Sequence, residues 1–154
     1  MTKPTPIRTP NRPSRALHLV DIENLAATAS VSQQVARRTA SEYLSAAQYN
    51  VGDLIVVASS HRNGLAARAA FPGATLRWRS GQDGADIALL DAYCEFDHLR
   101  FNRLVVGSGD GIFARLVASA RQDGLTVSVV THRHTASVAL RDAASSVALL
   151  GQAA

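Results

Sequence analysis

The sequence has few of the residues on which disulfide frameworks, thiolate metal sites and membrane spans depend. Its 154 residues include one cysteine, Cys94, so neither an internal disulfide nor a zinc site built from several thiolates can form. No apolar run reaches about 18 residues, and the amino terminus has no apolar stretch of signal-peptide length, which disfavours membrane spanning and secretion. The only lysine is Lys3, which excludes a Walker loop with its phosphate-binding lysine. We therefore expect a cytoplasmic protein in a reducing compartment.

Basic charge is concentrated at the start of the chain. The net charge is +4, yet residues 1–15 contain four of the 16 basic residues and no acid, so the rest of the chain is balanced. Four prolines in the same segment predict a disordered basic tail over residues 1–15. Two interpretations of this tail stay open, a solubilising leader and an arm that adds affinity for phosphate. The 47% hydrophobic content of the chain is enough for one core, so residues 16–154 are expected to form a single domain.

After residue 15, short apolar runs rich in β-branched residues alternate with amphipathic stretches. The predicted strands are residues 17–22, 54–58, 75–79, 104–106, 125–130 and 147–150. The predicted helices are residues 35–47, 85–96, 112–120 and 137–143. This alternation predicts an α/β fold, with a parallel sheet covered by helices on both faces. Right-handed crossovers then place the carboxyl ends of all the strands at one rim, where open sheets bind ligands.

Three aspartates stand at that rim in the predicted fold. Asp21 ends the first strand, Asp86 lies in the first turn of the helix after the third, and Asp110 is in the middle of the glycine-rich turn after the fourth. Two carboxylates about 5 Å apart repel by roughly 3 kcal/mol at an effective dielectric constant near 20, so a cluster protonates or binds a cation. Oxygen donors without thiolates or paired imidazoles favour magnesium or manganese over zinc. The sequence therefore predicts a Mg²⁺ or Mn²⁺ site formed by these three residues.

Two alternatives to a metal site exist for these segments. Asp86 and Asp110 could each be an ordinary helix cap or turn residue, whereas Asp21 does not obviously begin a helix and so favours a metal. The glycines of residues 107–111 could cradle a nucleotide phosphate. Their spacing does not match a dinucleotide fingerprint, however, because the next predicted strand ends in Val130-Thr131-His132 without the required acid. The aspartates point instead to phosphodiester chemistry through a metal.

Three motifs in order carry a resemblance to a known family. They are Val20-Asp21-Ile22-Glu23-Asn24, the segment from Gly84 to Asp91, and the segment from Gly107 to Phe113. Over about residues 17–150 the chain resembles the NYN domains, a branch of the PIN-like ribonuclease superfamily. The resemblance implies a PIN-like Rossmannoid fold with strand order 3-2-1-4-5, and metal-dependent cleavage of RNA. It also implies that Asp21, Asp86 and Asp110 are metal ligands, while Asn24 and Ser108 orient ligands or phosphate.

The chain departs from the family pattern at one position. Ile112 stands where the family has a second aspartate in its last motif, and its apolar side chain fits the inner face of the predicted helix. Three acids support one metal better than a symmetric pair of metals. Asp83 is close enough in sequence to lend a further ligand. Asp91, five residues after Asp86 on a helix, points elsewhere and is expected to be solvated.

Substrate contacts are expected from basic residues that follow the strands. Arg62, Arg79 and Arg133 fall at the carboxyl rim and are candidates for gripping single-stranded RNA. Trp78 either stacks on a base or packs in the core, and its alternation with Arg77 and Arg79 favours the core. Cys94 is expected to be buried and inert.

Alternative functions also stay open. Loss of the acid at Ile112 would be consistent with a catalytically weakened RNA-binding or regulatory module. The same rim would also suit a metal-dependent phosphatase or nucleotide-binding protein. The alanine-rich helix faces leave self-association open, and nothing indicates a membrane partner.

Overall fold

A computed structural model describes residues 13–132 and 134–151 of the chain. The strands are β1 (Ala16–Asp21), β2 (Leu54–Ser59), β3 (Thr75–Trp78), β4 (Arg103–Gly107), β5 (Thr126–Thr131) and β6 (Ser146–Leu149). The α-helices are α1 (Ile22–Ala26), α2 (Gln33–Ala46), α3 (Gly64–Ala70), α4 (Gly84–Glu95), α5 (Ala114–Gln122) and α6 (Val138–Ala143). Short 3₁₀ helices are η1 (His61–Asn63), η2 (His98–Arg100) and η3 (Gly111–Phe113). None of the helices in this part of the chain has the length and apolar character needed to cross a membrane.

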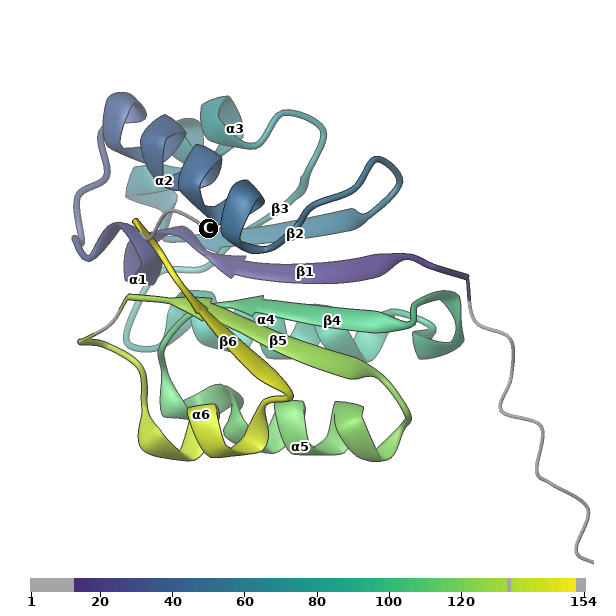
Figure 1. Ribbon diagram of the computed structural model, residues 1–154. Helices are drawn as coiled ribbons and strands as arrows, with labels where there is room; N and C mark the ends of the chain where they lie inside the picture. Colours follow the sequence, from purple (N-terminus) through teal and green to yellow (C-terminus); the bar gives the residue numbers. More distant parts are fainter. Residues whose placement is uncertain (1–12, 133, 152–154) are drawn as a thin grey trace, which may run out of the picture.

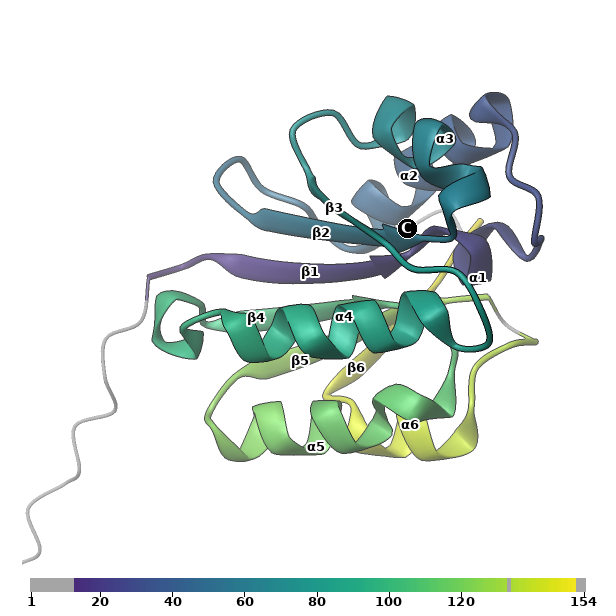
Figure 2. The same ribbon diagram turned by 180° about the vertical axis from the view of Figure 1, so that it is seen from behind.

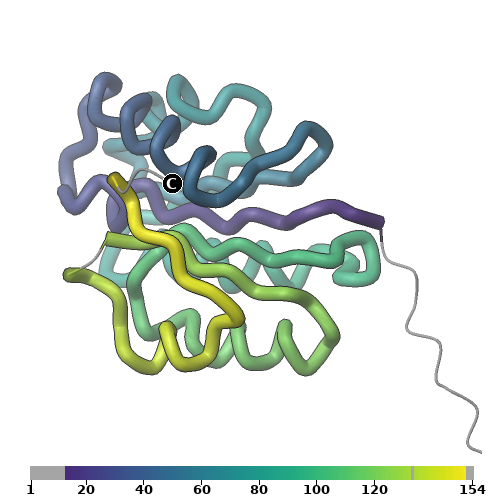
Figure 3. Tube along the Cα trace, in the orientation of Figure 1, coloured from purple at the N-terminus to yellow at the C-terminus, as the bar shows by residue number. Residues whose placement is uncertain are grey.

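The six strands form one parallel sheet in the order β3-β2-β1-β4-β5-β6. The expected α/β class and the order 3-2-1-4-5 are confirmed, and β6 is added beside β5. Figure 3 follows the chain from β1, in purple at the centre of the sheet, to β6, in yellow at its edge. Because every strand is parallel, all the carboxyl ends lie at the rim where Asp21 ends β1.

Helices cover both faces of the sheet, as Figures 1 and 2 show from opposite sides. Alternate residues of β1 enter two separate cores. Leu17 and Leu19 pack in the core beneath α4, α5 and α6. Val20 packs in the core beneath α2 and α3, where Tyr43 is fully buried. Helices on both faces of a parallel sheet therefore account for the near-continuous burial of β1.

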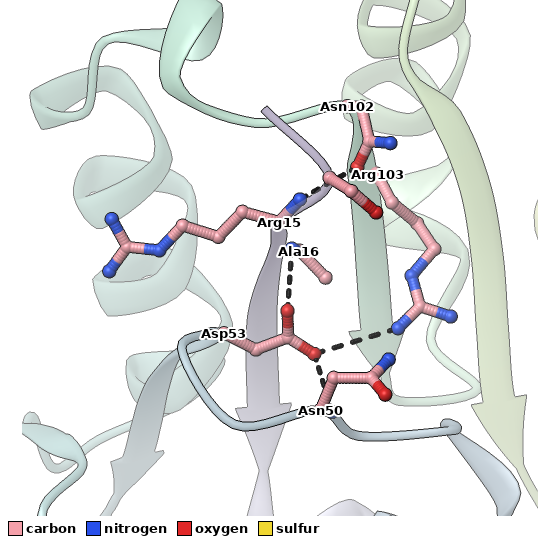
Figure 4. A pocket seen from close by; sticks show the side chains of 7 residues that line it. Arg15, Ala16, Asn50, Asp53, Asn102 and Arg103 are labelled. Carbon is pink, nitrogen blue, oxygen red and sulfur yellow. Dashed lines mark hydrogen bonds and ion pairs between the residues drawn. The ribbon is translucent and has the colours of Figure 1, made fainter. Parts of the chain in front are cut away.

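The rim opposite Asp21 holds a polar network around Asp53, whose residues line a pocket of about 220 Å³ (Figure 4). Arg15, expected to belong to the disordered tail, is docked at this rim. Its backbone N–H donates to Asn102 Oδ1 at 3.1 Å, and its guanidinium lies 5.4 Å from the centre of the Phe101 ring. The folded domain therefore includes Arg15, while residues 1–12 of the predicted tail lie outside the described residues.

His18 is fully buried within this network. Its Nδ1 lies 2.9 Å from the Tyr43 hydroxyl, and its Nε2 lies 3.2 Å from Asp53 Oδ2. Burial lowers the pKa of His18 despite the nearby Asp53 carboxylate, which raises it. Burial alone would raise the pKa of Asp53, but hydrogen bonds from the Ala16 and Asn50 N–H groups bring it below its usual range.

The contribution of His18 to stability is expected to fall as the pH drops below about 6.5, the ordinary pKa of histidine. The lowered pKa means that the folded state binds a proton at His18 less readily than the unfolded state does. Each pH unit therefore costs up to about 1.4 kcal/mol of unfolding free energy until the folded pKa is reached. Urea unfolding at pH 7.5, 6.5 and 5.5 measures this slope. In His18→Gln the part of the slope that is due to His18 should disappear. An unchanged slope in the variant would contradict the lowered pKa of His18.

Candidate metal centre

Asp21 lies at the junction of β1 and α1 and is only 6% exposed. Its Oδ1 accepts hydrogen bonds from the backbone N–H groups of Glu23 and Asn24, both at 3.0 Å. The predicted strand extended to Ile22 with no obvious helix start at Asp21, and both predictions were wrong. Asp21 caps a five-residue helix. Capping therefore fixes the orientation of this carboxyl group at the rim.

Asp86 lies in the first turn of α4, as predicted, and is also 6% exposed. Its carboxyl group is within hydrogen-bonding reach of the Asp21 carboxyl. Among the residues that the structure describes, none donates a hydrogen bond to the buried Asp86 Oδ1. A buried carboxylate oxygen without a donor is costly, so this atom is poised for a cation or a proton.

Asp110 follows β4 and caps η3, where its Oδ1 accepts from the Ile112 N–H at 2.9 Å. One carboxylate oxygen from each of Asp83, Asp86 and Asp110 lies within 4.8 Å of the other two. Asp83 enters this group from a turn with φ of 55°, in the left-handed region that few residues other than glycine, asparagine and aspartate adopt. Four aspartates therefore converge, because Asp21 adjoins the group through Asp86.

The pKa values of Asp86 and Asp21 are raised because these carboxyl groups are buried close to other acids. Burial raises the pKa of Asp86 to about 8, with further contributions from the negative charges of Asp21 and Asp110. Burial also raises the pKa of Asp21, although hydrogen bonds from Asn24, Asp86 and Glu23 act against it. Without a cation, Asp86 carries the proton near neutral pH and Asp21 accepts its hydrogen bond.

The donor set fits a hard divalent cation. Oxygens on opposite sides of one Mg²⁺ are about 4.2 Å apart, since each lies about 2.1 Å from the ion. The observed limit of 4.8 Å exceeds that span by about 0.6 Å, so small adjustments of the side chains would bring the three oxygens onto one ion. Asp86 Oδ1 accepts no hydrogen bond from the described residues, so this oxygen is available as a ligand for the ion. Asp83, Asp86 and Asp110 could hold the cation, with Asp21 adjoining them.

Asn24 and Ser108 support the turn that carries Asp110. Asn24 Oδ1 accepts from the Gly109 N–H at 2.9 Å, and Ser108 Oγ accepts from the Asp110 N–H at 3.2 Å. Gly109 itself packs so closely against the Thr135 carbonyl that a Cβ would clash. Ser108 is completely buried, so it can orient Asp110 but cannot touch a phosphate.

Replacing Asn24 by alanine should weaken metal binding through the position of Asp110. The change leaves the buried Gly109 N–H without its acceptor, which costs about 1–3 kcal/mol of stability. Loss of such a supporting hydrogen bond typically reduces metal affinity or activity about 10–100-fold. Urea unfolding measures the loss of stability, and metal titration measures the loss of affinity. Asn102→Ala is the matched control, because Asn102 accepts a backbone N–H bond in the same way at the opposite rim. Equal losses in both variants would contradict a positioning role.

Ile112 does not pack as predicted. It lies in η3 rather than in α5 and is 37% exposed, whereas Phe113 beside it is fully buried. The expectation that this position serves the core was wrong, because the first turn after Asp110 is a 3₁₀ turn that directs Ile112 to the surface. The missing family carboxylate is therefore at an exposed position beside Asp110. Asp83, rather than Asp91, adds a further acid to the cluster.

The three candidate arginines differ in their surroundings. Arg62 lies exposed in η1, after β2. Arg79 follows β3 and forms an exposed ion pair with Asp91 at 3.5 Å. Arg133 lies outside the described residues. Arg62 is therefore the candidate that the structure leaves open at the rim, since no ion pair joins it to an acid in residues 13–132 or 134–151.

A second polar network at this rim was not predicted from the sequence. Glu23 Oε1 accepts hydrogen bonds from the Ser60 N–H at 2.8 Å and from the side chains of Ser60 and Asn63, both at 2.5 Å. Asn63 Oδ1 in turn accepts from the Val31 N–H at 2.9 Å. These bonds fix the turn after β2, which carries Arg62, against α1. In the sequence, only Glu23 itself could have indicated this network, because it is an acid near Asp21 that neither caps a helix nor joins the cluster.

Comparisons with known proteins agree with this architecture. The sequence model of the NYN domain matches residues 11–150, nearly the whole chain. No curated protein matches. A crystal structure of a protein of unknown function from Vibrio parahaemolyticus has the same fold, with a TM-score of 0.61 and 20% identity over 90% of this chain and 94% of that one. The chain therefore belongs to the NYN domain family and has its PIN-like α/β fold.

Proposed function

We propose that the protein is a metal-dependent ribonuclease that uses Mg²⁺ or Mn²⁺ at the cluster of Asp21, Asp83, Asp86 and Asp110. The observation that carries this proposal is the buried Asp86 Oδ1, which has no donor among the described residues and faces the charges of neighbouring aspartates. A structural carboxylate would have found hydrogen-bond donors. Membership of the NYN family supports the proposed reaction class, hydrolysis of RNA phosphodiesters.

Each residue has a role that its contacts support. Asp86, Asp110 and Asp83 would hold the ion, and Asp21 would complete the site through its contact with Asp86. Asn24 and Ser108 keep Asp110 in place through the turn after β4. The bound ion supplies activation of water and stabilisation of charge on the phosphate. No side-chain nucleophile is required, and Arg62 is the candidate for holding the RNA backbone.

Asp83 is expected to compensate in part for the carboxylate that is absent at Ile112. Asp83→Asn should therefore weaken metal binding and reduce cleavage about tenfold or more, because one of the converging oxygens loses its charge. Asp91→Asn is the matched control. Asp91 is an exposed acid of the same segment that pairs with Arg79 instead of joining the cluster. Similar effects of the two substitutions on calorimetric metal titrations would argue against a role for Asp83.

Cleavage of labelled single-stranded RNA tests the proposed function. Purified protein is assayed with Mn²⁺, with Mg²⁺ and with chelator, beside the variant Asp21→Asn. We expect cleavage that requires the ion and is lost in the variant. Binding without cleavage in either ion would favour an RNA-binding module instead. Release of phosphate from free nucleotides, with intact RNA, would favour a phosphatase.

A further inference from the structure

The carboxyl end of β3 presents the only tryptophan of the chain to solvent. Trp78 is 51% exposed, although its alternation with two arginines favoured a core position. Arg77 and Arg79 lie on the face of the sheet that α4 covers, where they pair with Glu95 and Asp91 of that helix. Trp78 between them points to the opposite side of the sheet, toward α3. Because β3 is an edge strand and α3 has only seven residues, half of the indole remains uncovered.

The exposed indole is held against backbone. A Cβ placed on Gly64, the first residue of α3, would lie 2.9 Å from the indole Nε1, so only glycine permits this approach. Trp78 is also paired with Ser59 in the β2–β3 ladder, and the next residue donates its N–H to the Ser59 carbonyl at 3.0 Å. One side of the aromatic ring system is therefore fixed while the other is open. A fixed, half-open aromatic surface is suited to stacking with a planar ligand.

A basic turn lies between Trp78 and the aspartates. The register pairs Asp21 with Ala58, and Trp78 with the following residue, Ser59. With strands about 4.8 Å apart, the backbone of Trp78 lies about 10 Å across the rim from β1. The end of β2 lies between them and continues into η1, where His61 and Arg62 are exposed.

This turn is braced on both sides. His61 Nδ1 lies 2.8 Å from Ser80 Oγ, just beyond β3. Glu23 Oε1 accepts from the Ser60 N–H at 2.8 Å, on the side of α1. The backbone that carries Arg62 is therefore held at a defined place on the rim, and no acid of the described residues neutralises the Arg62 guanidinium. Cationic groups beside an exposed aromatic are the arrangement with which proteins bind single-stranded nucleic acids.

We propose that Trp78 stacks on an unpaired base of single-stranded RNA, whose backbone crosses the His61–Arg62 turn to bring a phosphate to the aspartates. The proposal deepens the proposed function and rests on it for the position of the phosphate. Stacking is tolerant of sequence, because every base has a π-face. A duplex has its bases already stacked and is not engaged. Trp78 is thus a determinant of single-strand selectivity rather than a catalytic residue.

The single tryptophan makes the contact directly observable by fluorescence. Metal-free protein in chelator is titrated at low ionic strength with a single-stranded RNA of about ten nucleotides. An oligomer of the same length made of abasic nucleotides and a duplex of the same sequence are the comparison ligands. Saturable quenching by the single strand, with little or none from the abasic or duplex ligands, is the expected result. Equal responses to all three ligands, or no binding of the single strand, would overturn the proposal.

Substitutions give a second readout through binding of fluorescently labelled RNA. Trp78→Ala should weaken binding of single-stranded RNA by roughly 5- to 150-fold, the range found when a stacking aromatic is removed. Trp78→Phe should retain most of the affinity because it keeps an aromatic face. Val51→Ala is the control, since Val51 is 99% exposed and precedes β2 at the opposite rim. Unchanged affinity in Trp78→Ala would overturn the proposal.

The experiments distinguish failure of the proposed ribonuclease activity from failure of the proposed Trp78 stacking contact. Quenching and loss of affinity in Trp78→Ala, without cleavage in any metal, would support the stacking contact and remove the nuclease. Metal-dependent cleavage with the same KM for single-stranded RNA in wild type and Trp78→Ala would support the nuclease and remove the stacking contact.

Discussion

Asp86→Asn is expected to abolish metal-dependent RNA cleavage while making the metal-free protein more stable at pH 8. Asparagine has nearly the same shape but no charge, so it removes the repulsion that raises the pKa of Asp86 to about 8. Relief of that repulsion should add roughly 1–3 kcal/mol to the free energy of unfolding. Cleavage should fall by more than the roughly 10–100-fold typical of residues that only support a metal ligand. Denaturant unfolding and initial cleavage rates measure the two effects.

The opposite directions of these effects make the variant informative. A structural carboxylate that accepts hydrogen bonds would lose stability on conversion to asparagine. Asp142→Asn is the control, because Asp142 is an exposed acid of α6 that does not belong to the cluster. It should change neither quantity. Destabilisation by Asp86→Asn at pH 8 would contradict the metal-centre assignment.

Mn²⁺ or Mg²⁺ is expected to raise the melting temperature, and to do so more at pH 8 than at pH 6. An ion present at about 100 times its dissociation constant adds about 2.7 kcal/mol. For a chain of this length that corresponds to roughly 5–10 °C. At lower pH the ion has to displace the proton that Asp86 holds, so the increment shrinks.

The sign of this pH dependence follows from the raised pKa. The folded state binds the Asp86 proton more tightly than the unfolded state, so the contribution of Asp86 to the stability of the metal-free protein falls as the pH rises from about 4 toward about 8. A bound ion takes the place of the proton and restores that stability. Thermal unfolding with the ion and with chelator, from pH 6 to pH 8.5, measures the difference. An increment that is independent of pH, or that is equal in Asp86→Asn, would count against the assignment.

Much of the fold was predictable because the chain repeats strand and helix with clear periodicity. The six strands were found within a few residues of their bounds, and the parallel alternation located the functional rim before any side chain was placed. Two short helices, α1 and α3, were missed. Neither is long enough to show helical periodicity, and α1 begins at a residue that also ends a strand.

The proximity of Asp86 to both Asp21 and Asp110 was predictable for the same reason, since the carboxyl ends of parallel strands meet, although Asp21 adjoins Asp86 and is not in the group of three oxygens within 4.8 Å of one another. Asp83 was harder to place, because its position depends on a left-handed turn and on the packing of α4 against the sheet. The support that Glu23 gives to the turn after β2 depends on contacts between segments 37 and 40 residues apart. Local patterns carry no information about such contacts.

Three side chains were assigned to the wrong environment. Trp78 does alternate as a strand residue should, but the face of the edge strand on which it lies is only partly covered. Ile112 was placed on a helical face, whereas it belongs to a 3₁₀ turn with a different angular spacing. Cys94 lies on the exposed side of α4, because Leu89, Ala92 and Tyr93 form its buried side. For Trp78 and Cys94 the strand and the helix were predicted correctly, and the extent to which each side chain is covered depended on the tertiary structure.

The metal-centre assignment requires aspartates that are distant in sequence to share one divalent cation. A crystal structure of the protein grown with Mn²⁺, with anomalous data collected near the manganese absorption edge, tests this requirement most directly. We expect an anomalous peak at about 2.0–2.3 Å from carboxylate oxygens of Asp86 and Asp110, with Asp83 or Asp21 completing the protein ligands. Crystals soaked at saturating Mn²⁺ that show no peak between these residues, with Asp86 Oδ1 bonded to a protein donor, would contradict the assignment.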